Sequence, residues 1–196
     1  MDYKDLFFTL YPNFFERDYV KNLPEKDFFD ELILDLKNFS EKDLEIEIPQ
    51  NITFGFLQGD INNKNLQDAI KSVDVEWVQF FTEDLKDRIY CAFDGEKIAS
   101  FCIVDSFGNY KDLKVGGPGC VGTVPEYRKK GIGLKLVQKA TAILKSQGYD
   151  LSFIHWTKVA SWYQKLGYKL ILNWNSKGFN WFLKTKEISS PDLLLC

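Results

Sequence analysis

The stretch GGPGCVGTVPEYRKKGIGL (116–134) holds two glycine-rich segments, and each resembles a loop that binds phosphate. The first, residues 117–123, has the glycine and threonine spacing of a nucleotide-triphosphate loop but lacks the lysine before the threonine that reaches the outer phosphates. It also leads into a pattern typical of a strand, whereas a phosphate loop leads into a helix. We therefore expect no nucleoside triphosphatase site here.

The second segment, RKKGIG (128–133), follows an expected strand and Pro125 and opens an expected helix. The first turn of a helix has unpaired N–H groups and a partial positive charge, and glycine lets an anion approach them closely. A dinucleotide-binding fingerprint is excluded because its third glycine is absent. The residues alone leave two interpretations open: a phosphate site, or a helix start whose lysines are simply solvated.

The apolar pattern around this stretch predicts a mixed α/β sheet with helices on its faces. Residues 88–104 read as two strands joined by a tight turn at Asp94-Gly95. The other expected strands are 52–57, 119–124, 151–156, 169–175 and 178–184, and the expected helices are 66–81, the segment from about residue 132 to Gly148, and 157–166.

Residues 24–39 place six apolar side chains at helical spacing behind Pro24, which predicts an amphipathic helix. We assign residues 1–50 to an N-terminal helical extension, 51–186 to the main domain and 187–196 to a C-terminal tail. The role of the extension does not follow from its sequence.

Composition and charge narrow the functional classes. The sequence is 45% hydrophobic and 16% aromatic, which suits one globular domain with a buried core. Residues 1–100 carry 22 acidic and 11 basic side chains, and residues 101–196 carry 6 acidic and 14 basic ones. Either an anion binds in the second half, or the imbalance is only an uneven solvated surface. The pI near 5.3 argues against nucleic acid as a partner, and the pattern predicts no membrane span.

The cysteines at 91, 102, 120 and 196 and the single histidine, His155, have no metal-ligand spacing, so we expect no metal. We expect reduced thiols and a cytoplasmic protein, which is a monomer or a homodimer. A reactive Cys120 is an alternative, but a nucleophilic thiol needs an activating base and the sequence has one histidine.

The residues VGTVPEYRKKGIGLKLVQKA (121–140) resemble the acetyl-CoA-binding motif of the GCN5-related N-acetyltransferase (GNAT) superfamily, with Arg128, Gly131 and Gly133 at its defining positions. ASWYQKLGYK (160–169) resembles a second segment of that family, and it places Tyr163 at the tyrosine that commonly serves as general acid. The resemblance implies the GNAT fold, a mostly antiparallel sheet of six to seven strands with helices on both faces and a splayed central strand pair.

The resemblance also implies a mechanism in which an amine attacks acetyl-CoA directly, without an acyl-enzyme. The pantetheine arm would bind the main chain of Val121 and Thr123 along the splayed strand, and the first glycine segment would give access to the thioester. The pKa of a tyrosine, about 10, is only modestly higher than that of a thiol, about 8.5, so Tyr163 could protonate the leaving group. The pyrophosphate would bind beside Arg128, on the amides of Lys129, Lys130, Gly131, Ile132, Gly133 and Leu134.

The sequence departs from the family pattern at two points. Trp156 stands where many members have an asparagine that contacts the cofactor arm, and the expected fourth core strand lacks a carboxylate. The general base is therefore open between His155, Asp105, Glu76 and a water chain, and a histidine beside a tryptophan is also a common core residue.

These patterns predict an acetyl-CoA-dependent N-acetyltransferase that acts on a small-molecule amine, with a slight preference for an amino sugar by family analogy. The alternative is a noncatalytic acyl-CoA sensor or interaction module that keeps the cofactor site.

Overall fold

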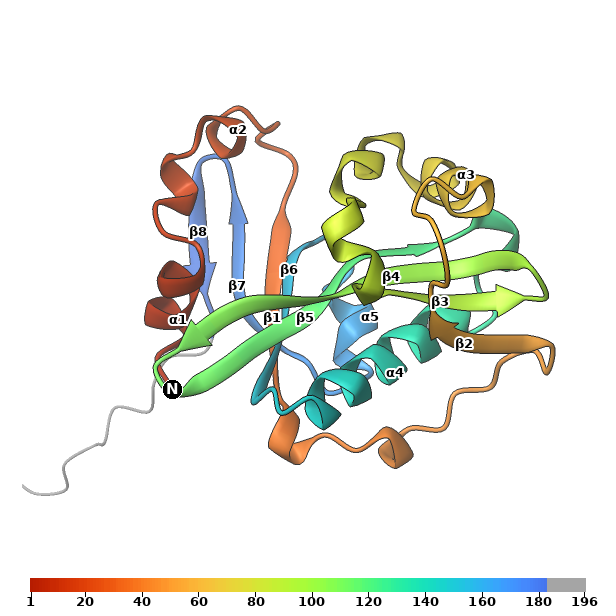
Figure 1. Ribbon diagram of the computed structural model, residues 1–196. Coiled ribbons are helices and arrows are strands. Elements are labelled where there is room, and N and C mark those ends of the chain that lie inside the picture. Colours follow the sequence, from red (N-terminus) through yellow and green to blue (C-terminus); the bar gives the residue numbers. More distant parts are fainter. Residues whose placement is uncertain (183–196) are drawn as a thin grey trace, which may run out of the picture.

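The computed structural model describes residues 1–182, which form one eight-stranded sheet flanked by helices (Figure 1). The strand order is β2-β3-β4-β5-β6-β1-β7-β8, and every neighbouring pair is antiparallel except β5 and β6. The strands are β1 Phe29–Asp35, β2 Ile52–Phe56, β3 Ile89–Asp94, β4 Lys97–Tyr110, β5 Leu113–Thr123, β6 Leu151–Thr157, β7 Lys169–Asn175 and β8 Gly178–Trp181. The α-helices are α1 Tyr3–Leu10, α2 Asp18–Lys21, α3 Lys64–Val73, α4 Ile132–Ser146 and α5 Ala160–Gln164.

The elements that surround the glycine-rich stretch confirm the expected α/β class. The β3–β4 hairpin turns at Gly95 and Glu96, one residue later than expected, because Asp94 still pairs with Lys97. Gly95 has a φ of +60° that suits this tight turn. Helix α4 ends before Gly148, whose φ is +77°. The helix expected over 66–81 is shorter, because Asp74 is extended and caps a separate 3₁₀ helix, Val75–Phe80, through the amide of Glu76. The expected tail, 187–196, lies outside the described residues.

The helix expected over 24–39 is wrong, since this segment contains strand β1. Phe29, Leu32, Ile33 and Leu34 are all buried, because β1 lies inside the sheet and is covered on both faces. A continuous apolar run of this kind does not distinguish a buried strand from a helix by periodicity. The added strand also explains why the sheet has eight strands rather than six or seven.

Strand β1 lies between two strands that follow each other along the chain. It is antiparallel to both β6 and β7, so these two are parallel to one another and α5 connects them as a crossover. The domain boundary near residue 50 stays a prediction, but the first part of the chain supplies a strand that is hydrogen-bonded on both sides within this sheet.

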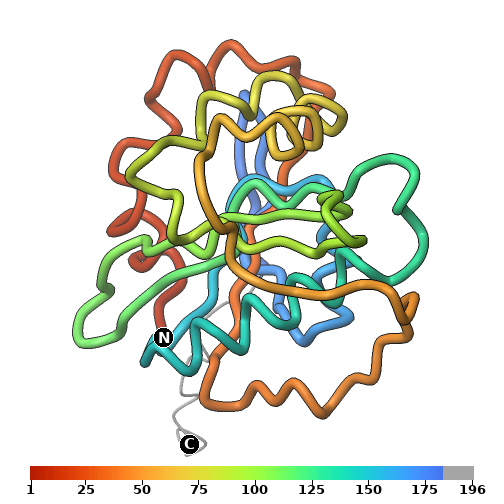
Figure 2. The backbone as a smooth tube through the Cα atoms, turned by 45° about the vertical axis from the view of Figure 1, so that its right-hand side comes forward, coloured from red at the N-terminus to blue at the C-terminus, as the bar shows by residue number. Residues whose placement is uncertain are grey.

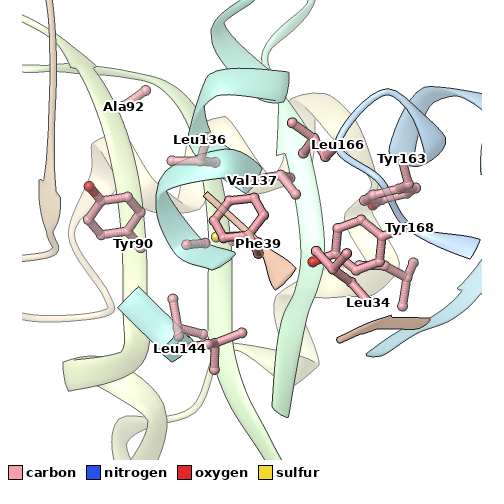
Figure 3. Close-up of a cluster of buried hydrophobic side chains, with 14 of the residues drawn as sticks. Leu34, Phe39, Tyr90, Ala92, Leu136, Val137, Leu144, Tyr163, Leu166 and Tyr168 are labelled. Atoms are coloured by element: carbon pink, nitrogen blue, oxygen red, sulfur yellow. The ribbon is translucent and has the colours of Figure 1, made fainter. Parts of the chain in front are cut away.

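Side chains alternate between two packed layers on opposite faces of the sheet. Helices α4 and α5 cover one face, where Leu136 and Tyr163 join a single large cluster (Figure 3). On the other face, α1 covers one cluster through Leu6 and Phe7, and α3 covers another through Leu66. The expectation of helices on both faces is confirmed.

The segment between β1 and β2 follows α4 on its outer side (Figure 2). The side-chain amide of Gln138 donates to the carbonyls of Glu41 and Leu44, and Lys145 donates to the carbonyl of Phe39. We call residues 39–51 the strap, and it fixes the outer surface of α4.

Strands β5 and β6 separate soon after they meet, which confirms the splayed pair. Their register joins only Val115 to Leu151 and Gly116 to Ser152. Further along β5, Phe101 of β4 pairs with Gly122 and Ile103 pairs with Gly119, so one extra residue bulges at Cys120, whose φ is +46°. The remaining edge of β5 therefore faces a gap in the sheet.

Within the described residues, none of the helices has the length and apolar character needed to cross a membrane.

Candidate active site

A cleft of about 560 Å³ opens where β5 ends and α4 begins. It gathers residues from both motifs of the sequence, since the end of β5, the first turn of α4 and helix α5 all border it. All of the expected cofactor residues except Lys130 line it, together with Tyr163, and their binding role stays a prediction. The full lining is Val73, Val121, Thr123, Tyr127, Arg128, Lys129, Gly131, Ile132, Gly133, Leu134, Val159, Trp162, Tyr163 and Lys165.

The first turn of α4 presents a row of unpaired backbone donors. No described residue accepts a hydrogen bond from the N–H groups of residues 129–134, and no side chain caps the helix. Lys129 and Gly131 both have positive φ, +61° and +75°, which turns the chain sharply into the helix. This arrangement fits an anion such as a pyrophosphate, because such amides and the helix dipole both favour negative charge.

Gly131 and Gly133 are required by the packing of the chain itself. A Cβ atom on Gly131 would collide with the carbonyl oxygen of Glu47 in the strap, and one on Gly133 would collide with Oγ1 of Thr123. The sequence pattern alone indicates only room for a ligand. The structure adds that both glycines let α4 approach the strap and the end of β5 closely.

The basic residues before α4 differ in their surroundings. Nε of Arg128 donates a 3.0 Å hydrogen bond to the carbonyl of Thr123, which ties the loop to the end of β5. Nζ of Lys130 lies 5.4 Å from the ring centre of Tyr127, and Lys130 does not line the cleft. Arg128, Lys129 and Lys130 are all exposed, so their charges are available to an anion beside the free amides.

The glycines at the start of the stretch 116–134 allow close packing within the sheet. Gly116 and Gly117 lie within β5, where a Cβ atom would collide with the carbonyl of Asp105 in the first case and with the carbonyl of Phe153 in the second. These glycines allow β4 and β6 to approach β5 just before the gap opens. The prediction that these glycines give access to the thioester stays a prediction. Close packing of the strands is enough to explain why glycine is present here.

Tyr163 combines burial with an unbonded hydroxyl. The residue is only 6% exposed, and its hydroxyl makes no hydrogen bond to a described residue. The hydroxyl oxygen is not fully buried, so it reaches the cleft that Tyr163 lines. Burial raises the pKa of Tyr163 far above its ordinary value, with the nearby Tyr168 as a smaller cause. The difference between the pKa of this phenol and that of a thiol is therefore larger than the sequence suggests, and the phenol stays neutral.

His155 does not line this cleft. It lies on the α1 face of the sheet, where Nδ1 is 2.8 Å from Oε2 of Glu31 and the ring stacks on Tyr11 at 4.1 Å between centres. The sequence pattern alone does not identify Glu31, because the apolar spacing around it predicts a helix. A carboxylate in the middle of an apolar run was the signal that could have found it.

The other base candidates differ from His155. Asp105 is bonded to Nη1 of Arg88 at 2.9 Å and to the amide of Ser106, and Glu76 is exposed in the 3₁₀ helix after α3. Among residues 1–182, no group of three or more His, Cys, Asp or Glu side chains is arranged to hold a metal ion. Burial raises the pKa of the Cys120 thiol to about 11, so a nucleophilic role for Cys120 is disfavoured.

Comparison with known proteins agrees with the motifs. Residues 86–170 match the family model of the acetyltransferase (GNAT) domain. No protein of curated function matches the sequence. The glucosamine N-acetyltransferase region of a fungal multi-domain GH3 beta-N-acetylglucosaminidase is similar in structure, with a TM-score of 0.60 and 21% identity over 76% of this chain and 20% of that chain.

Two bacterial structures share the fold at lower similarity. A GCN5-related N-acetyltransferase from Sphaerobacter thermophilus has a TM-score of 0.56 and 16% identity over 74% of this chain and 49% of that chain. A protein assigned to the GNAT family from Novosphingobium aromaticivorans has a TM-score of 0.50 and 15% identity over 74% of this chain and 61% of that chain. The chain thus spans less than two thirds of each of these structures. Over residues 86–170, the chain carries a domain of the GCN5-related N-acetyltransferase superfamily.

Proposed function

We propose that the protein transfers an acetyl group from acetyl-CoA directly to the amine of a small molecule. One observation carries this proposal: the amides of 129–134 are unpaired, and all of these residues except Lys130 line the same cleft as the unbonded hydroxyl of Tyr163. The first feature suits a pyrophosphate, and the second suits a leaving group that gains negative charge. Arg128 and Lys129 add positive charge at the anion end of the cleft.

The edge of β5 supplies the middle of the site. The gap beside Val121 and Thr123 leaves main-chain groups without a strand partner on the β6 side, which suits the amide-rich pantetheine arm. One of these N–H groups would also donate to the thioester oxygen as negative charge develops there.

Tyr163 would act as a neutral donor to the departing sulfur. Because burial raises its pKa, the phenol keeps its proton at neutral pH, and it is a weaker acid than an exposed tyrosine. A hydrogen bond to the developing thiolate is then the main stabilisation, and the proton moves late, as the C–S bond breaks.

An amino sugar is the first acceptor class to test. The similarity to a glucosamine N-acetyltransferase region supports this choice, although at 21% identity it carries the fold rather than the substrate. The acidic first half of the sequence also suits a cationic acceptor.

The experiment is thiol release from acetyl-CoA across a panel of small amines that includes glucosamine and aminoglycosides. Acceptor-dependent release of free coenzyme A supports the transferase. Thermal stabilisation by acetyl-CoA with no turnover on any amine would favour the sensor instead, and neither stabilisation nor turnover would contradict both.

A further inference from the structure

Glu31 is a carboxylate with no exposed surface, at the centre of a strand that is buried on both faces. Its Oε1 atom accepts hydrogen bonds from Nε1 of Trp174 at 2.8 Å and from the amide of Trp156 at 3.2 Å. Its Oε2 atom lies 2.8 Å from Nδ1 of His155. A buried charge is costly unless it is paired and hydrogen-bonded, so this arrangement is a specific one.

The Glu31 contact decides which imidazole nitrogen carries the proton. A carboxylate can only accept, so Nδ1 of His155 is the donor and the lone pair of a neutral ring lies on Nε2. Nε2 makes no hydrogen bond to a described residue. The atom is not fully buried, so it reaches solvent. The side chain is 22% exposed although Tyr11 covers one ring face.

The register of the strands sets His155 beside the gap in the sheet. Phe153 of β6 packs against Gly117 of β5, and parallel strands advance together from there. His155, two residues further on, is therefore level with Gly119 and the bulge at Cys120. This is the edge of β5 that leads to Val121.

His155 and Tyr163 belong to opposite faces of the sheet. His155 contacts Phe7 and Phe14 in the α1 layer, whereas Tyr163 packs in the α4 layer. An acceptor that enters from the α1 side would thus meet His155, which can take a proton. The thiolate would leave on the α4 side, where Tyr163 can give a proton.

We propose that His155 is the general base that deprotonates the acceptor ammonium, and that Glu31 is a positioning residue that fixes the His155 tautomer. This inference rests on the proposed acetyl transfer. It gives residues 1–50 a function, because their strand β1 brings Glu31 into the sheet beside β6.

The proton and electron balance is simple. Nε2 of His155 takes one proton from the ammonium, and the free amine forms the N–C bond to the thioester carbon. The C–S bond breaks with its electron pair on sulfur, and sulfur takes the phenolic proton of Tyr163. The second proton on nitrogen then returns to the tyrosinate, so the reaction yields an amide, free coenzyme A and one proton released through His155.

Charged groups around His155 are few. Glu31 on β1 and the phenol of Tyr11 contact the ring, and Arg17 lies against the ring of Phe14. Asp105 on β4 is near enough to Tyr11 and to Cys120 to contribute to the raised pKa of both, of which burial is the larger cause. Two carboxylates and two guanidinium groups, those of Arg17 and of Arg88, which is bonded to Asp105, therefore surround this part of the α1 face.

The first test is His155→Asn, which keeps an N–H donor at the Nδ1 position for Glu31 but removes Nε2. We expect turnover to fall about 10²- to 10⁴-fold, as for loss of a general base, with unchanged affinity for coenzyme A. The loss should shrink for an acceptor whose amine is already neutral at the assay pH. A purely structural role would give the same loss for both kinds of acceptor and would overturn the proposal.

The second test needs no His155 variant, because the sequence has one histidine. In the wild type, the ¹⁵N signals of its imidazole should show the proton on Nδ1, and the acid limb of kcat/KM should follow the titration of that ring. In Glu31→Gln, the two N–H donors on the Oε1 side hold the amide oxygen, so the amide NH₂ faces Nδ1 and moves the ring proton to Nε2. Turnover should then fall together with the tautomer change.

The outcomes separate this inference from the proposed function. A wild type without turnover on any amine contradicts the transferase itself. An active wild type whose His155→Asn variant is equally active, or whose acid limb does not follow the histidine, contradicts only the role of His155.

Discussion

Nδ1 of His155 lies 2.8 Å from Oε2 of Glu31, although 124 residues separate them in the sequence. The pairing depends on strand β1, which lies between β6 and β7 and comes from outside the region that matches the family model, 86–170. The first part of the chain therefore completes the sheet beside β6, while the residues of both GNAT motifs line the cleft from the end of β5, the start of α4 and α5.

Replacing Tyr163 by Phe should lower turnover about 10²- to 10⁴-fold and leave the affinity for coenzyme A unchanged, because only the proton donor is removed. The hydroxyl has no hydrogen bond to a described residue, so the variant should be as stable as the wild type. Steady-state kinetics and a thermal melt measure both. Unchanged turnover would remove the acid role of Tyr163.

Gly131→Ala and Gly148→Ala form a matched pair, since both glycines have a φ near +75°. A side chain in this region costs about 1–2 kcal/mol in either case. Only at position 131 would the new Cβ also collide with the carbonyl of Glu47, whereas Gly148 has open space around it. Urea unfolding should show the larger loss for Gly131→Ala, which should also weaken coenzyme A binding; equal losses would contradict the packing of the strap on α4.

The sequence predicted the elements whose signals are local. The β3–β4 hairpin, whose turn lies one residue beyond the expected position, the apolar stripe of α4 and the glycine-rich start of that helix depend on residues close together in the chain. Strand β1 was missed because Phe29, Leu32 and Ile33 fit a helical period and a doubly buried strand equally well. The Glu31–His155 pair was out of reach, since it depends on a strand register that no local pattern contains.

Replacing Tyr168 by Phe should cost about 1–3 kcal/mol of unfolding free energy. Its buried hydroxyl bonds to Oγ of Ser152 at 2.7 Å and to Oγ1 of Thr141 at 2.9 Å. Thr141 keeps a second bond to the carbonyl of Val137, but Ser152 would be left buried without a partner. Tyr110→Phe is the control with a smaller expected loss, because its partner Asp5 is exposed to water; equal losses would contradict the account.

The protein should lose stability as the pH rises above about 10. Burial raises the pKa of Tyr168 to about 12, whereas an unfolded tyrosine titrates near 10. Between these values the unfolded state has lost a proton that the folded state keeps, so the unfolding free energy falls with increasing pH. Tyr168 alone should remove about 1 kcal/mol between pH 8 and pH 11, and Tyr90 and Cys91 add to the loss because burial raises their pKa to about 12.

Urea unfolding at pH 8 and pH 11 measures this loss, and the Tyr168→Phe variant should lose less between the two values than the wild type. An unfolding free energy that stays constant or rises to pH 11 would contradict the buried, neutral state of these groups.

The most direct test of the cleft is a titration with coenzyme A followed by the backbone ¹H–¹⁵N signals of the protein. Gly131 and Gly133 lie in the row of unpaired amides, and Gly148 and Gly178, away from the cleft, serve as internal references. We predict saturable shifts at Gly131 and Gly133, with the references unmoved. Binding that leaves the amides of 129–134 unchanged, or no binding at millimolar coenzyme A, would contradict the proposed site.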